Sequence, residues 1–254
     1  MMINLRGHRE EVPAHLLFMV SFAEVEVFMH EIPFLGIDEG QPSFSELCLF
    51  DSRYEHYRTG FVKKSYPAGA CIHSQGDKIT HFGIVTSGIL KAVSYSRDGS
   101  EMCHTYFEEM DSFPEFLYLT GERRYTYLLY VEKRAAVTWI PILELQEMLT
   151  SEPHMLSALL LYVSKRGLKN QLYLNCLNYQ TIRERIAYWI LGIQKMTSGK
   201  TVMIPRSQTI LANMLHVSRA SLNQELKQME REGYFRLDKE KILGADAEKL
   251  MELL

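Results

Sequence analysis

The sequence has few cysteines, and they form no pattern typical of a metal site or a disulfide framework. The four cysteines, Cys48, Cys71, Cys103 and Cys176, are scattered without CxxC spacing, whereas zinc sites and iron–sulfur clusters use closely spaced ligands. Cys71 and His73 would supply only half of a tetrahedral site. We therefore expect reduced thiols, no bound metal and no cofactor.

Long apolar runs and catalytic signatures are missing as well. Glu24 and Glu26 interrupt the apolar stretch at residues 16–28, which is too short for a membrane span. An acidic Arg-Glu-Glu precedes it instead of the basic head of a signal peptide. No G-x-S-x-G elbow or phosphate loop is present. The sequence thus predicts a cytoplasmic protein that is not an enzyme and has no membrane partner.

An excess of positive charge is also absent. The 254 residues carry a formal net charge of −3, with 46% hydrophobic and 23% charged residues. These values fit a globular protein long enough for two domains. DNA binding needs only a local basic face, and residues 204–227 contain Arg206, Arg219 and Lys227 against one acid, Glu225.

Residues 207–235 have the pattern of two short helices joined by a tight turn. The apolar residues that recur at helical spacing are Ile210, Leu211, Met214 and Leu215, then Leu222, Leu226 and Met229. Ser207 and Ser218 stand at N-cap positions, and Gly233 follows as a C-terminal stop. We expect a helix-turn-helix whose helices pack on each other, although an ordinary helical hairpin would look similar.

Two short runs of mainly apolar residues follow these helices. Residues 234–237 and 241–243 flank Asp238-Lys239-Glu240, which predicts a two-stranded wing even though Lys-Glu is a poor turn signal. Residues 245–254 predict a short terminal helix. The C-terminal part therefore has the pattern of a winged helix-turn-helix.

The middle of the chain, residues 57–140, consists of short β-branched and aromatic runs. We expect turns at Ala68-Gly69, Gln75-Gly76, Ser87-Gly88 and Asp98-Gly99. Strands at this spacing predict a sandwich or small barrel.

Residues 153–177 predict a long helix with a coiled-coil seam. The seam positions are Leu156, Leu160, Val163, Gly167, Asn170, Leu174 and Leu177. A parallel homodimer would pair them, while the alternative is a helix packed on its own domain. Met155, Leu159 and Leu161 add apolar surface that a β-roll lying alongside could bury.

Several motifs in this order resemble a known family. They are the sensor glycines Gly76, Gly83 and Gly88, the turn at residues 98–101 and the segment at residues 217–226, Val-Ser-Arg-Ala-Ser-Leu-Asn-Gln-Glu-Leu. Together they resemble the cyclic-AMP receptor protein and fumarate-nitrate regulator (Crp/Fnr) family of bacterial transcription factors, over about residues 50–245.

The resemblance implies an α+β fold of three parts, and the first 45 residues, which do not fit the family plan, make a fourth. We expect an N-terminal extension of unassigned role at residues 1–45 and an effector-sensing β-roll, like a cyclic-nucleotide-binding jelly roll, at residues 46–150. A dimerisation helix at residues 151–178 and a winged helix-turn-helix at residues 179–254 complete the chain.

The resemblance also implies which residues contact DNA. Arg219 matches a base-reading arginine, whereas Gln224 replaces a frequent second arginine and should favour adenine over guanine. Ala220 replaces an acidic reader and offers only a methyl group. The predicted DNA contacts are Ser207, Ser218, Arg219, Ala220, Ser221, Asn223, Gln224 and Lys227.

The sensor departs from members that bind cyclic nucleotides. Their Gly-Glu-Leu element corresponds to residues 114–116, Pro-Glu-Phe, and Tyr125 replaces the phosphate-binding arginine. We therefore expect an apolar or aromatic effector with a small anionic group instead of cyclic AMP. The predicted effector-binding residues are Phe113, Glu115, Phe116, Tyr118, Arg123, Arg124, Tyr125, Thr126, Leu159 and Val163. Alternatively, the aromatic side chains fill the core of the roll.

Our hypothesis is that the effector binds between the β-roll and the long helix and reorients two recognition helices on a palindromic double-stranded operator. RNA polymerase would be a further partner if the protein activates transcription. The alternatives are a dimeric ligand-binding β-roll and a cupin-like metalloenzyme, without a DNA-binding role. His73 and His81 are too far apart for a cupin H-x-H motif, and Glu108, Glu109 and Asp111 fit a solvated turn.

Overall fold

The structure is a computed structural model that describes residues 42–197, 199, 201–205 and 208–254. Residues 1–41 of the predicted N-terminal extension and Ser207 lie outside the described residues. Strands occupy most of residues 62–141, and helices dominate from there onward. This is the α+β order that the sequence predicts.

The β-roll is a six-stranded antiparallel sheet built around two long strands, β3 and β6, which pair along most of their length. The strand order is β1-β6-β3-β4, while β2 pairs with β6 and β5 with β3. Val85, Leu90 and Val137 are fully buried in its core. The strands are β1 (Val62–Tyr66), β2 (Cys71–His73), β3 (His81–Tyr95), β4 (Glu101–Phe107), β5 (Ser112–Phe113) and β6 (Leu128–Pro141).

The expected turn at Ser87-Gly88 is wrong, because both residues lie inside strand β3. The pairing of β3 with β6 shifts register on either side of Ser87, and Gly88 has a φ of 82°. A Cβ atom at Gly88 would come within 2.1 Å of the Arg134 carbonyl oxygen. Glycine is therefore required here by a bulge in a continuous strand, which needs the same backbone freedom as a turn.

Short helices cover one end of the roll. Phe44 begins α2, within the predicted extension at residues 1–45, and its ring packs edge-on against Phe82 at 5.8 Å. Leu145 of α4 is fully buried in the same cluster. These helices are α2 (Phe44–Phe50), the 3-10 helix η1 (Ser52–Gly60), α3 (Glu115–Leu119) and α4 (Ile142–Ser151).

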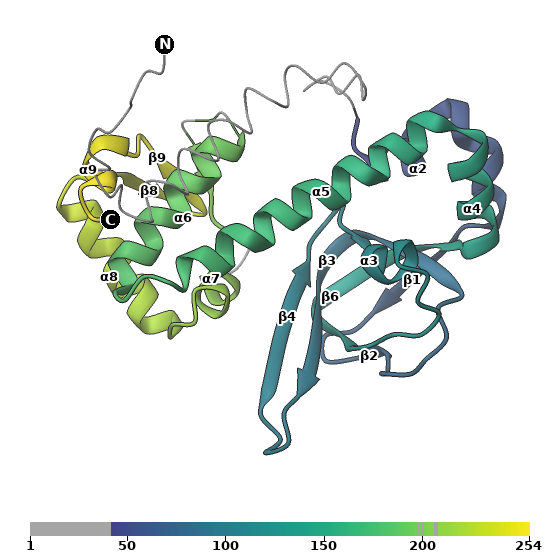
Figure 1. Cartoon of the computed structure of the whole chain (residues 1–254), viewed down its shortest axis with the longest axis horizontal. Coiled ribbons are helices and arrows are strands. Elements are labelled where there is room, and N and C mark those ends of the chain that lie inside the picture. The colour runs from purple at the N-terminus through teal and green to yellow at the C-terminus, as the bar shows by residue number, and fades with distance from the viewer. Residues whose placement is uncertain (1–41, 198, 200, 206–207) are drawn as a thin grey trace, which may run out of the picture. The chain divides into compact units, whose positions relative to one another are not determined.

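The long helix α5 (Pro153–Cys176) follows α4 directly and continues toward the C-terminal helices (Figure 1). Its first residue is a proline, which fits a first helical turn because the N–H group there has no partner within the helix. Met155 and Leu159 are fully buried in the core cluster of the roll. The expectation that the roll buries this side of the helix is confirmed for these two residues.

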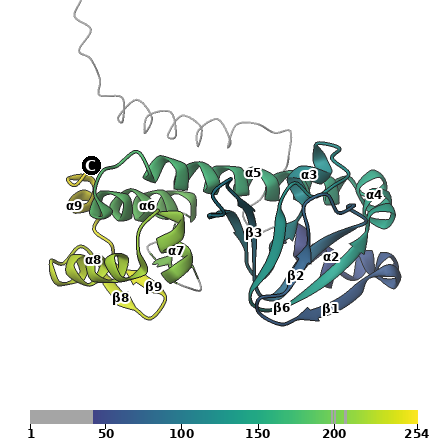
Figure 2. The same ribbon diagram turned by 90° about the horizontal axis from the view of Figure 1, so that it is seen from below.

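The C-terminal part has one core, formed by helices and a small sheet. Figure 2 shows α6 running beside the end of α5, where a Cβ atom at Gly192 would meet Leu172 Cδ1 at 2.2 Å. The lack of a side chain at Gly192 thus allows α5 and α6 to approach each other closely. The elements are α6 (Ile182–Thr197), β7 (Thr201–Met203), α7 (Gln208–Met214), α8 (Arg219–Arg231), β8 (Arg236–Asp238), β9 (Lys241–Leu243) and α9 (Ala247–Met251).

The predicted wing is present but belongs to a three-stranded sheet of order β7-β9-β8. The sequence did not indicate β7, a three-residue strand with one buried side chain, Val202. Lys239, between β8 and β9, has a φ of 53°. The turn therefore forms despite its unfavourable sequence, because the backbone of this lysine adopts the left-handed conformation. The terminal helix α9 is shorter than residues 245–254.

Candidate nucleic-acid interface and sensor site

Helix α8 starts at the position expected for a recognition helix. The Ser218 side chain accepts a hydrogen bond from the Ser221 backbone N–H at 3.0 Å, which makes Ser218 the N-cap. Leu222, Leu226 and Met229 are fully buried on the inner face. The amphipathic pattern therefore fixes which face of α8 points outward.

That outer face carries the predicted DNA contacts. Ser218, Arg219, Ala220, Gln224 and Lys227 are exposed. Ser221 and Asn223 are half-buried beside them. No described residue forms an ion pair or side-chain hydrogen bond with Arg219, Gln224 or Lys227. These three polar groups are available to another molecule.

The only acid expected on this basic segment, Glu225, is instead part of an internal anchor. Arg183 of α6 lies with its Nε 2.6 Å from Glu225 Oε1 and its Nη1 2.7 Å from Glu232 Oε2. The Arg183 hydrogen bonds, together with that of Gln228, hold the pKa of Glu232 below its usual value. The two ion pairs tie α8 to α6, and Glu225 does not oppose the approach of a phosphate as a free charge.

Helix α7 divides its apolar residues between two partners. Leu211 and Leu215 are fully buried in the C-terminal core, as expected for helix-turn-helix packing. Ile210 is also buried, at 4% exposure, but it packs against Ile89 and Tyr106 of the roll. The expectation that Ile210 packs between the two helices is therefore wrong, because the roll covers it.

The predicted dimer seam is largely open along α5. Leu156 is 39% exposed, Leu160 42% and Leu174 65%. Gly167 is exposed, and Val163, Asn170 and Leu177 are half-buried. Exposed leucines of this size on one helix form an apolar stripe suited to a partner helix.

The predicted effector-binding residues do not form one site. Phe113, Tyr125 and Leu159 are buried in core clusters or beside them, at 0%, 1% and 0% exposure. The alternative reading, in which aromatic side chains fill the core, holds for these positions. Tyr118 and Val163 are half-buried; Phe116, Arg123, Arg124 and Thr126 are exposed.

Glu115, in contrast, lies in a buried polar cluster together with Arg166 of α5. The Arg166 Nε atom is 2.7 Å from Glu115 Oε1, and Nη1 is 3.3 Å from Asp111 Oδ1. Its guanidinium also lies over the Phe107 ring at 4.7 Å, and Nη2 donates to Thr105 Oγ1 at 3.1 Å. Glu115 and Arg166 are both almost fully buried, so this cluster joins α5 to the roll through a buried ion pair.

The sequence reasoning missed two members of this cluster. Asp111, expected in a solvated turn, is paired with Arg166 and accepts a hydrogen bond from the Tyr162 hydroxyl at 3.3 Å. Arg166 lies on the buried side of α5 with Met155, Leu159 and Tyr162, at spacings of four, three and four residues. A positive charge that continues an apolar stripe is the signal that could have identified it.

Burial dominates the electrostatics of this cluster. It raises the pKa of Glu115 to about 7, against the attraction of Arg166, which favours the charged carboxylate. Glu115 is therefore the group of this cluster whose charge can change near neutral pH.

Tyr125 occupies the position where the resemblance implies a phosphate-binding arginine. Its ring stacks on His73 with centroids 4.3 Å apart, and burial raises its pKa. No described group hydrogen-bonds its buried hydroxyl. A buried hydroxyl without a partner costs about 1–3 kcal/mol, so a ligand atom that bonded it would be favoured.

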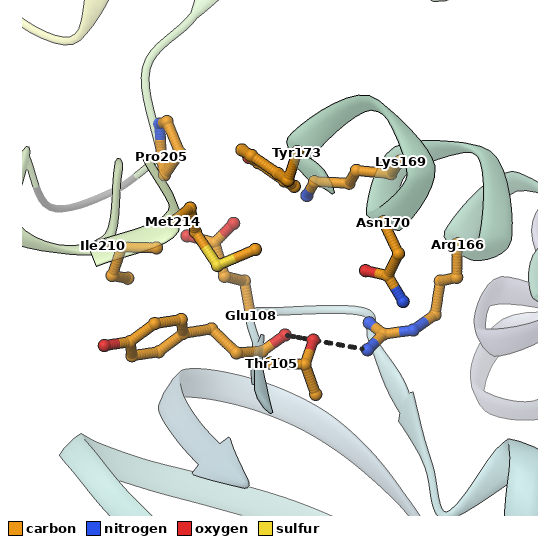
Figure 3. Close-up of a pocket in the computed structure, with 10 residues that line it drawn as sticks. Thr105, Glu108, Arg166, Lys169, Asn170, Tyr173, Pro205, Ile210 and Met214 are labelled. Atoms are coloured by element: carbon orange, nitrogen blue, oxygen red, sulfur yellow. Dashed lines mark hydrogen bonds between the residues drawn. The ribbon is translucent and has the colours of Figure 1, made fainter. Parts of the chain in front are cut away.

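A small cavity lies between β4, α5 and α7, beside Arg166 (Figure 3). Lys169 and Asn170 of α5, Tyr106 of β4 and Met214 of α7 contribute to its wall, and its volume is about 30 Å³. None of the ten predicted effector residues lines it. It is large enough for a water molecule or a few ligand atoms only.

Among the residues that the structure describes, no three or more His, Cys, Asp or Glu side chains gather as a metal site would require. The helices of the described part also include none with the length and apolar character needed to cross a membrane.

Two family profiles match the chain. That of the cyclic nucleotide-binding domain matches residues 63–152, and that of the Crp-like helix-turn-helix domain matches residues 184–253. No curated protein sequence matches the chain.

Solved structures share the fold at low sequence identity. FixK2 from Bradyrhizobium japonicum is 14% identical with a TM-score of 0.57, over 76% of this chain and 96% of that one. A CooA mutant from Carboxydothermus hydrogenoformans is 17% identical with a TM-score of 0.57, over 84% and 95%. CLP, a c-di-GMP-responsive global regulator of Xanthomonas campestris, is 18% identical with a TM-score of 0.52, over 76% and 97%.

Proposed function

The chain belongs to the Crp/Fnr family of transcription regulators, which are not enzymes, and we propose that it binds a palindromic double-stranded operator as a homodimer in the cytoplasm. The outer face of α8 carries this proposal. Arg219 and Gln224 are exposed and have no partner among the described residues, whereas Arg183 of α6 is paired with Glu225 of α8 and with Glu232 at its C-terminal end. A guanidinium and an amide in this arrangement suit guanine and adenine edges.

Selection from random double-stranded DNA tests this proposal and supplies an operator. We expect an enriched two-fold site with half-site centres about one helical turn apart. Arg219→Ala should weaken binding to that site about 10- to 100-fold, which corresponds to the loss of one bidentate base contact. Fluorescence anisotropy at several salt concentrations would measure this change.

Arg97→Ala provides the matched control, because Arg97 is an exposed arginine in the turn between β3 and β4. It removes the same charge without touching α8. Equal affinity of the two variants for the selected site would count against DNA reading by α8. Failure to enrich any two-fold sequence would count against the proposal as a whole.

The homodimer rests on the exposed leucines of α5. Leu160→Glu places a charge in the seam and should convert the dimer to a monomer at micromolar concentration, because two carboxylates would face each other in an apolar contact. Analytical ultracentrifugation would measure the mass. Lys165→Glu, at an exposed position of the same helix away from the seam, should remain dimeric. If the Leu160→Glu variant remained a dimer, the assignment of the seam to the dimer interface would be contradicted.

The effector is proposed to be a small molecule other than cyclic AMP, bound between the roll and α5. Tyr125 in place of an arginine, and its unpartnered hydroxyl, support a ligand with a hydrogen-bonding group and fewer negative charges. Native mass spectrometry of protein purified from its host would reveal a retained ligand by its mass. Saturable binding of cyclic AMP that depends on Tyr125 would contradict the proposal. If the protein activates transcription, RNA polymerase is the expected further partner.

A further inference from the structure

The first helix of the helix-turn-helix carries a stripe of residues that contact the roll. Ile210, Asn213 and Met214 follow the i, i+3, i+4 spacing of one helical face. Ile210 joins Ile89 and Tyr106 in a separate buried cluster, and Met214 packs against both this cluster and the C-terminal core. An apolar side chain at Ile210 would be solvent-exposed if the roll did not cover it.

A directed polar contact fixes the register of this stripe. The Asn213 side-chain Nδ2 donates a hydrogen bond to the Tyr106 hydroxyl oxygen at 2.7 Å. Tyr106 is 8% exposed, whereas Asn213 is exposed. Apolar packing sets the strength of such an interface, and a short directed hydrogen bond restricts its geometry.

The strand that carries Tyr106 is tied to the dimer helix at the neighbouring residue. Arg166 of α5 donates to Thr105 Oγ1 and pairs with Glu115, so β4 is attached to α5 beside the contact with α7. Figure 3 shows Arg166 and Thr105 joined at one side of the cavity, with Ile210 and Met214 at the other. The position of α7 relative to α5 thus depends on the roll as well as on the chain connection.

We propose that Tyr106 is a positioning residue for DNA binding. Its contacts with Ile210 and Asn213 fix the position of the helix-turn-helix relative to α5 in each protomer. The two recognition helices of a dimer are therefore already placed for both half-sites in the DNA-free protein. This inference rests on the proposed binding of a two-fold operator. Binding both half-sites with a preset pair of domains avoids the entropic cost of ordering them on the DNA.

Tyr106→Phe tests the contact, since it keeps the ring and removes only the hydroxyl. Loss of one hydrogen bond should weaken binding to the two-fold site about 3- to 10-fold. Binding to an isolated half-site should stay unchanged, because a single helix-turn-helix needs no placement relative to its partner. Tyr95→Phe, at an exposed tyrosine near the end of β3, is the matched control and should bind both sites like the wild type.

Asn213→Ala supplies the second variant, at an exposed residue where folding is not at risk. Combined with Tyr106→Phe in a double-mutant cycle, it should add little to the single loss, because both changes remove the same bond. Equal affinity of the wild type and Tyr106→Phe for the two-fold site would overturn the inference, and so would tighter binding. An equal loss on the half-site would also overturn it, by showing damage to the domain instead of its placement.

Failure of the positioning role can be distinguished from failure of the proposed function. A wild-type protein that selects no DNA overturns that function. A wild-type protein that selects a two-fold site, together with an unaffected Tyr106→Phe variant, overturns the positioning role alone.

Discussion

Helices α5 and α8 each carry an arginine, and the two arginines lie in opposite surroundings. Arg166 of α5 is 9% exposed, between Glu115 and Asp111, whereas Arg219 of α8 is exposed and has no ion-pair partner among the described residues. The charge of Arg166 is therefore used within the chain to hold the roll against the helix. The charge of Arg219 remains available for a partner outside the chain. A charged side chain on an amphipathic helix can thus serve cohesion or recognition, and its surroundings decide which.

The largest difference should appear in stability. Arg166→Met leaves two carboxylates without their cation and should lower the free energy of unfolding by about 3 kcal/mol. Arg219→Met should change it by less than about 0.5 kcal/mol, since its guanidinium pairs with none of the described residues. Urea unfolding followed by the fluorescence of Trp139 and Trp189 would measure both. Equal effects of the two substitutions would break the comparison.

The next effect is the pH dependence of stability that Glu115 contributes. Burial raises its folded-state pKa to about 7, above the unfolded value near 4.3. The folded state then binds the proton more tightly, so this contribution to stability is complete below about pH 4.3 and is lost as pH rises through 7. Relative to Glu115→Gln, the wild type should lose roughly 4 kcal/mol across this window.

Chemical denaturation of both proteins at several pH values would measure this difference, and the common titrations of other groups would cancel. A difference that stays constant from pH 4 to pH 8 would show that Glu115 keeps its charge in the folded protein. The Arg166 cluster would then be a conventional ion pair.

A third prediction concerns the base that α8 reads. Gln224→Arg should shift the preference at one operator position from adenine to guanine, by about 2 kcal/mol, because a guanidinium pairs bidentately with guanine. Anisotropy titrations with operators that differ at that position would measure the shift. Gln228→Arg adds the same charge one turn later, where Gln228 bonds Glu232, and should leave the preference unchanged. If Gln224→Arg instead increased the affinity for all operator sequences by the same factor, position 224 would contact phosphate and not a base.

The smallest effect belongs to Lys227, which is expected to contact phosphate. Lys227→Ala should weaken binding a few-fold at every sequence and reduce the slope of log affinity against log salt by about 0.9. Lys249→Ala, at an exposed lysine of α9, should leave the slope unchanged. A change in base preference at Lys227→Ala would contradict a phosphate role.

The outer face of α8 could be predicted from the sequence because local periodicity assigns it. Leu222, Leu226 and Met229 mark the buried side, so Arg219, Gln224 and Lys227 on the opposite side face outward. The Ser218 cap was identifiable for the same reason, since it depends only on the residues that follow it.

Positions that depend on distant partners were assigned less well. Ile210 and Leu211 are adjacent apolar residues, and only the fold shows that one packs on the roll and the other in the C-terminal core. Arg166 and Asp111 are 55 positions apart, and nothing local marks them as a pair. At Gly88 the sequence indicated a turn, whereas the glycine has a positive φ in a bulge of a continuous strand.

The spacing of neighbouring residues was enough to predict the order of roll, long helix and helix-turn-helix, the outward face of α8 and the exposed leucines of α5. The fold was needed to show that Glu115 is paired with Arg166, that the buried Tyr125 hydroxyl has no hydrogen-bond partner among the described residues and that α7 packs on the roll. Burial and pairing are set by segments that lie far apart in the chain. A side chain's type and spacing do not reveal which distant group will remove it from water.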